Sequence, residues 1–120
     1  MSAMVDSLPQ EVREYYEKLA SQIFSAVDKL LKGGKFDPVS LETEHETIEA
    51  GFHPEVLKDI VVNELEKRGM EYKVIETPWY ADLWYEIIYP VSEGKEAHVK
   101  IYYSSWYNVH KIVVFLKVRT

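Results

Sequence analysis

The chain has 120 residues, a formal net charge of −6 and no cysteine. This length suits one domain with its own core, and the lack of cysteine excludes a disulfide framework, a thiolate nucleophile and a thiolate zinc site. Apolar residues make up 47% of the chain, but no apolar run approaches the roughly 20 residues that span a bilayer. The first seven residues lack the basic and apolar regions of a signal peptide, so we expect a cytoplasmic protein without a membrane segment.

The negative charge is concentrated in the first part of the chain. Residues 1–70 contain fourteen acidic and eight basic side chains, whereas residues 71–120 contain six of each. We expect a single domain over residues 1–120, with a disordered lead-in at 1–6, a mainly helical acidic half at 7–70 and an aromatic-rich β half at 71–120. Net acidity disfavours general binding to nucleic acid, because phosphate backbones repel it.

Two helices are predicted in the acidic half. The first follows a capping-box pattern at residues 7–10 and continues to Gly33, with apolar side chains at helical spacing along one side. These side chains are Val12, Tyr16, Leu19, Ile23, Val27 and Leu30. The second helix begins at Pro54 and ends at Gly69, and its predicted buried stripe contains Leu57, Ile60, Val61 and Leu65. Residues 38–50 fit a helix or a strand, and the helix is favoured because acidic residues are poor strand formers.

The aromatic-rich half is predicted to form an antiparallel meander. Four stretches, 72–77, 83–91, 98–103 and 109–118, read as strands, and the last two alternate in polarity with a period of two. Short connections make neighbouring strands antiparallel. One face of the last strand is uniformly apolar from Ile112 onward, so the helices are expected to cover it. The predicted fold class is α+β, with two or three N-terminal helices packed on one face of a roughly four-stranded sheet.

Aromatic side chains are the strongest feature of the β half. It holds all three tryptophans and seven of the nine tyrosines. A single apolar face of a sheet cannot bury so many of these side chains and still give each of their polar atoms a hydrogen-bond partner. We expect part of this set to be exposed for binding, although any single member can equally pack in the core. The predicted binding residues are Trp79, Tyr80, Trp84, Tyr102, Trp106 and Tyr107, with Lys100, Lys111 and Lys117 as cations and Arg119 beside them. Exposed aromatic residues anchor protein interfaces or stack on single-stranded bases.

A dense acidic segment raises the question of a metal site. Glu42, His45, Glu46 and Glu49 would share one face of a helix and offer the oxygen and nitrogen ligands that divalent metals accept. Their spacing matches no metal motif, and a solvated acidic helix face explains them equally well. We therefore predict neither metal nor cofactor, with these four residues as the candidates if a metal binds.

The order of elements over residues 54–103 resembles that of PD-(D/E)xK nucleases. Glu64 lies on a predicted helix, Asp82 opens a strand and Lys100 lies on the next strand. The resemblance implies carboxylates that hold Mg²⁺ and a lysine that steadies the attacking water. The chain departs from the family pattern, because His98 stands two residues before Lys100 in place of glutamate and Ala81 precedes Asp82 in place of proline.

These patterns predict a non-catalytic interaction module. It would bind a protein partner, or a second copy as a homodimer, through the aromatic loops and the exposed sheet face. A homodimer would also bury the open edge of the sheet. The alternatives are a single-stranded DNA or RNA binder, which uses aromatic stacking and lysines, and a metal-dependent or degenerate nuclease. No grouping of Ser, His and Asp suggests nucleophilic catalysis.

Overall fold

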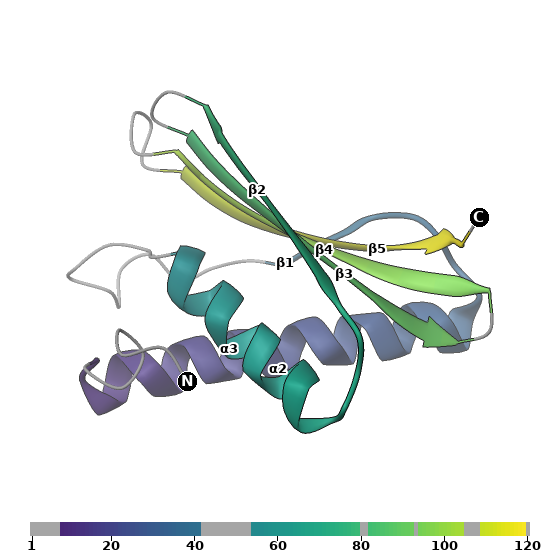
Figure 1. The fold of residues 1–120 in the computed structure, drawn as a ribbon, viewed down its shortest axis with the longest axis horizontal. Helices are drawn as coiled ribbons and strands as arrows, with labels where there is room; N and C mark the ends of the chain where they lie inside the picture. Colours follow the sequence, from purple (N-terminus) through teal and green to yellow (C-terminus); the bar gives the residue numbers. More distant parts are fainter. Residues whose placement is uncertain (1–7, 42–53, 80–81, 93, 105–108, 120) are drawn as a thin grey trace.

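A computed structural model describes residues 8–41, 54–79, 82–92, 94–104 and 109–119. Its elements are, in chain order, α2 (Gln10–Gly33), β1 (Val39–Leu41), α3 (Pro54–Lys67), β2 (Lys73–Trp79), β3 (Asp82–Ser92), β4 (Lys95–Ser104) and β5 (Val109–Val118). The strands form one sheet in the order β1-β5-β4-β3-β2, and all neighbours are antiparallel. Figure 1 shows both helices on one side of this twisted sheet. None of the described elements covers the other side, and the α+β prediction is confirmed.

Helix α2 packs on β5 and β1, and its apolar residues recur every three or four positions along one side. The predicted stripe is confirmed, and its buried members are Tyr16, Leu19, Ile23, Val27 and Leu30. The predicted capping role of Gln10 is wrong. Pro9 is the cap residue without a side-chain bond, and Gln10 Nε2 donates to Glu14 Oε1 at 2.9 Å. Ser7, the other half of the predicted capping box, lies outside the described residues.

Helix α3 lies beside α2 and packs on β3 and β4. Its core contacts come from Val56, Leu57, Val61 and Leu65, which are fully buried. Ile60 is only partly buried, and Val56 joins the core without being part of the predicted stripe. The helix ends at Lys67, two residues before the predicted end at Gly69, whose φ of 66° suits a residue without a Cβ.

Strand β1 is the fifth strand and was not predicted as one. Val39 to Leu41 pair with β5 in the register Val39 to Val114 and Leu41 to Ile112, so the helix favoured from sequence is wrong at these residues. The local pattern fits a helix or a strand. The strand forms because it pairs with backbone N–H and C=O groups at the edge of β5 that need hydrogen-bond partners. Residues 42–53, with the candidate metal ligands Glu42, His45, Glu46 and Glu49, lie outside the described residues.

The predicted meander of β2 to β5 is confirmed in order and direction. Because side chains alternate along each strand, one face turns to the helices and forms the core. Its buried residues are Tyr85, Ile87, Tyr89, Ala97, Val99, Ile101, Ile112, Val114 and Leu116. The β3–β4 connection contains Gly94 with a φ of 76°, which suits a residue without a Cβ. No helix among the described residues is long and apolar enough to cross a membrane.

Candidate functional site

The uncovered face of the sheet, called the open face below, is the candidate site. The strand register puts on this face the alternate residues that the core does not use. Its apolar members are Ile75, Trp84, Ile88, Tyr102, Val113 and Phe115. Its polar and charged members are Lys73, Thr77, Glu86, Glu96, His98, Lys100, Lys111 and Lys117. The open face is therefore an apolar centre crossed by charges of both signs.

The most prominent contact on the open face joins Trp84 and Tyr102. Trp84 on β3 lies directly opposite Tyr102 on β4, and both strands have a neighbour on each side. Their ring centroids are 4.2 Å apart at an interplanar angle of 43°, and Trp84 keeps 40% of its surface exposed. A hollow of about 250 Å³ lies beside this pair, and Ile75, Glu86 and Lys100 line it together with Trp84. Trp84 is thus an exposed member of the aromatic set, and its part in binding stays a prediction.

His98 is the one buried polar residue among the described residues, with 6% of its surface exposed. Its ring stacks on Phe115 at 4.8 Å and 13°. Nε2 lies 3.0 Å from Glu96 Oε1, and Nδ1 lies 3.4 Å from Glu86 Oε2. A neutral imidazole has one N–H and donates to only one of these carboxylates, whereas an imidazolium donates to both. His98 thus ties two acidic side chains into the open face.

The predicted cations do not form a single patch. Lys100 Nζ lies 3.8 Å from Glu86 Oε2 and 5.6 Å from the ring centroid of Phe115, so a carboxylate already faces it. Lys111 and Lys117 are six residues apart on β5, which is about 20 Å along a strand. Arg119 follows β5, where its backbone N–H donates to the Gly94 carbonyl and its side chain lines a different hollow.

The residues of the nuclease resemblance are not brought together. Glu64 lies on α3, on the helix side of the sheet, and is paired with Arg68 Nε at 3.1 Å. His98 and Lys100 lie on the open face, so the sheet separates them from Glu64. Asp82 pairs with Ser104, four residues from Lys100 and therefore about 14 Å along the strand. The described residues contain no group of three or more His, Asp or Glu side chains arranged to hold a metal ion.

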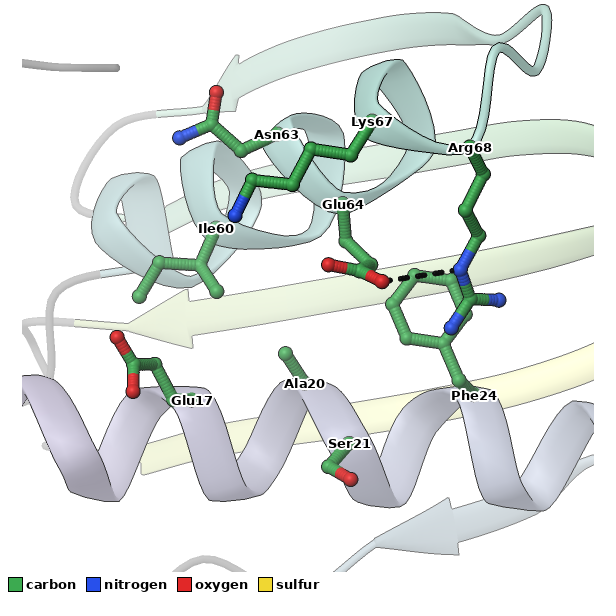
Figure 2. Close-up of a pocket in the computed structure, with 9 residues that line it drawn as sticks. All are labelled: Glu17, Ala20, Ser21, Phe24, Ile60, Asn63, Glu64, Lys67 and Arg68. Atoms are coloured by element: carbon green, nitrogen blue, oxygen red, sulfur yellow. Dashed lines mark hydrogen bonds and ion pairs between the residues drawn. The ribbon is translucent and has the colours of Figure 1, made fainter.

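A second concave region lies between α2 and α3 (Figure 2), with a volume of about 420 Å³. Glu17, Ser21 and Phe24 line it from α2, while Asn63, Glu64 and Lys67 line it from α3, with Arg68 at its end. The Arg68 guanidinium lies 4.3 Å from the centroid of the Phe24 ring and binds Glu64. Sequence reasoning missed this groove, because its walls are about forty residues apart in the chain and carry no motif.

Two tyrosines of the aromatic set belong to the core. The pKa of Tyr85 is raised to about 12, mostly by burial and in smaller part by the nearby carboxylates Glu76, Glu55 and Asp59. Burial also raises the pKa of Tyr89, against the opposing effect of Arg68. The Tyr89 hydroxyl is buried without a hydrogen-bond partner among the described residues. These side chains stabilise the helix side of the sheet and leave binding to the other face.

The predicted aromatic loops lie largely outside the described residues, which exclude Tyr80, Trp106 and Tyr107. Trp79 is the last residue of β2 and pairs with Asp82 across the sheet. Because Asp82 also pairs with Ser104, the β2–β3 and β4–β5 connections leave the sheet at the same end. The part of the two loops in binding stays a prediction.

Comparison of the chain with protein-family models, curated proteins and solved structures finds no significant match. Any proposal about the function therefore rests on the geometry of the described residues.

Proposed function

We propose that the protein is a non-catalytic binding module that contacts another protein through its open face, with Trp84 as the anchor. The observation that supports this most directly is the 40% exposure of Trp84 on an inner strand. A tryptophan at such a position is costly to leave in water and is typical of the residues that dominate binding energy in protein interfaces.

The surroundings of Trp84 support a protein partner. Apolar atoms of Ile75 and Tyr102 lie next to it, and Thr77, Glu86 and Lys100 are the polar residues beside this centre. An apolar centre within a polar rim is the usual anatomy of a protein interface. Carboxylates of Glu86 and Glu96 on the same face repel a phosphate backbone, which favours protein over nucleic acid.

A single-stranded nucleic acid is the second candidate, and the Trp84–Tyr102 pair favours it. Aromatic rings on inner strands of an uncovered sheet offer stacking surfaces worth about 1–3 kcal/mol per base. Lys111 pairs with Tyr102 across the sheet and remains exposed, so a cation lies next to these rings. This candidate needs the bases to compensate for the nearby carboxylates and for the net charge of −6.

The test compares immobilised wild type with Trp84→Ala and with the control Tyr72→Ala. Tyr72 is 37% exposed and lies between α3 and β2, outside the open face. Proteins retained from a cell extract by wild type and the Tyr72 variant, but lost from the Trp84 variant, are expected as open-face partners, and each is then measured in purified form. Equal retention of every protein by all three forms would show that the open face is not the contact surface.

The same three forms distinguish the nucleic-acid candidate. Single-stranded DNA and RNA are titrated against tryptophan fluorescence at low and at moderate salt. Saturable quenching that weakens with salt and disappears in Trp84→Ala would favour the nucleic-acid candidate, because phosphate contacts release counterions. Unchanged fluorescence at both salt concentrations is the result expected for a protein-binding module.

A further inference from the structure

Strand β2 forms one edge of the sheet, and its backbone groups on the outer side face no neighbouring strand among the described residues. Residues 73–78 are all exposed, including Val74 and Ile75, which keep 36% of their surface exposed although they point to opposite faces. A free edge with apolar side chains on both faces is a template for pairing with a further strand.

Neither described helix covers the helix side of this edge. Val74 and Glu76 pair with Ile87 and Tyr85, so they lie on the side of the sheet that the helices cover elsewhere. Both are nevertheless exposed, which means that neither helix reaches over β2. A strand from another molecule can therefore approach β2 without meeting α2 or α3.

The residues of β2 suit pairing with a copy of themselves. Two identical antiparallel strands in one sheet are related by a two-fold axis normal to the sheet, so one residue must face its own counterpart. The pairing stretch runs from Lys73, where β2 begins, to Thr77, because Pro78 has no N–H to donate. The middle residue of this stretch is Ile75.

We propose that the protein forms a homodimer in which the β2 strands of two copies pair antiparallel around Ile75, which makes one continuous sheet. Ile75 then faces Ile75 of the second copy, Lys73 faces Thr77, and Val74 faces Glu76. No like charges are opposed in this register, whereas a centre at Glu76 opposes two glutamates, which destabilises a sheet. The dimer pairs the backbone groups of the β2 edge and does not need Trp84, so it does not depend on the proposed function. It places the two open faces side by side.

Single cysteines test the register, because the chain has none of its own. Facing residues in antiparallel strands have Cα atoms about 4.5–5.5 Å apart, within the range of a disulfide. Ile75→Cys is expected to form a covalent dimer under mild oxidation. The control Thr77→Cys lies on the same face of β2, yet its two copies would be about 14 Å apart along the strand, so it is expected to remain uncrosslinked.

Charge variants test whether this contact holds the dimer together. Light scattering of wild type is expected to give twice the chain mass of 14.1 kDa. Ile75→Lys and Ile75→Glu are each expected to be monomeric, because two like charges meet at the centre, and an equal mixture of both is expected to restore the doubled mass. Circular dichroism confirms that each variant is folded. Trp84→Ala is expected to stay dimeric, which separates this test from that of the open face.

Three results would overturn the dimer. The first is a monomer mass for wild type at every concentration reached. The second is equal cross-linking of Ile75→Cys and Thr77→Cys, which would indicate random collision. The third is a doubled mass that persists in both Ile75→Lys and Ile75→Glu, or that Trp84→Ala abolishes, which would place self-association on another surface.

Discussion

Side chains of the same type lie in different environments in this protein. The strand register decides whether each one faces the helices or the open face. Tyr89 is 3% exposed and packs near Phe24 with a ring distance of 6.1 Å, whereas Tyr102 lies on the open face against Trp84. His98 is buried although it lies on the open face, because Phe115 and two carboxylates surround it. Residue type alone indicates none of these environments.

Tyr89→Phe is expected to raise the free energy of unfolding by about 1 kcal/mol. The hydroxyl has no hydrogen-bond partner among the described residues, and a buried unpaired polar group costs about 1–3 kcal/mol. Chemical denaturation followed by circular dichroism measures the change. The control Tyr72→Phe removes the same atom from an exposed tyrosine bonded to Glu66, and is expected to alter stability by less than about 0.5 kcal/mol. A destabilised Tyr89→Phe would show that the hydroxyl is satisfied in solution.

Hydrogen bonds at the ends of the helices fix the positions of these elements, in addition to the side chains that the elements bury. The C-terminus of α2 is a Schellman motif, in which the Lys35 N–H donates to the Leu30 carbonyl and the Gly34 N–H donates to the Leu31 carbonyl. Gly34 has a φ of 63°, which lets the chain leave the helix toward β1. The short β1 then finds its place by pairing with β5.

Substitutions at the two adjacent glycines are expected to have opposite signs. Gly34→Ala should lower the free energy of unfolding by about 1 kcal/mol, because the left-handed conformation opposes a Cβ. No atom lies within 4 Å of the added Cβ, so the cost is conformational and not steric. Gly33→Ala should raise the free energy of unfolding by about 0.4–1 kcal/mol, because the unfolded chain loses conformational freedom. Only the flexible Lys35 side chain lies near the added Cβ. Thermal and denaturant unfolding of both variants check this, and an equal effect at both positions would contradict it.

The molecule as a whole combines a compact helix-covered core with an uncovered sheet face. The core contains residues of α2, α3 and four of the five strands, namely β1, β5, β4 and β3. Strand β2 contributes little to it. Two of its members, Tyr85 and Tyr89, must stay protonated to remain buried. Among the described residues, the outer edge of β2 and the open face are surfaces that no helix or further strand covers.

Stability is expected to fall at alkaline pH because of these tyrosines. Burial raises the pKa of Tyr85 from 10 to about 12, so its contribution is fully present below pH 10 and is lost as the pH rises through 12. The loss from Tyr85 amounts to about 2 kcal/mol by pH 12, and Tyr89 acts in the same direction. Tyrosinate absorbance and far-ultraviolet circular dichroism are followed together. Ionisation of all tyrosines near pH 10 without loss of secondary structure would contradict the prediction.

The sequence by itself determined the elements whose pattern is local. The stripe from Tyr16 to Leu30 and the alternation in β4 and β5 repeat within a few residues, so they indicate helix or strand directly. The start of α3 at Pro54 and its end at Lys67, just before Gly69, also follow from local signals. Alternation assigns a face to each residue once the strands are known.

Only the tertiary structure decided what depends on distant partners. Val39 to Leu41 became a strand because the β5 edge pairs with them, and no local signal separates that outcome from a helix. Glu64 and Lys100 are 36 positions apart in a plausible order, yet the sheet lies between them. The contacts of His98 with Glu86 and Phe115 likewise follow from the register of three strands. Pairing between strands is a long-range event, and the register that it fixes brings the residues of the candidate site together.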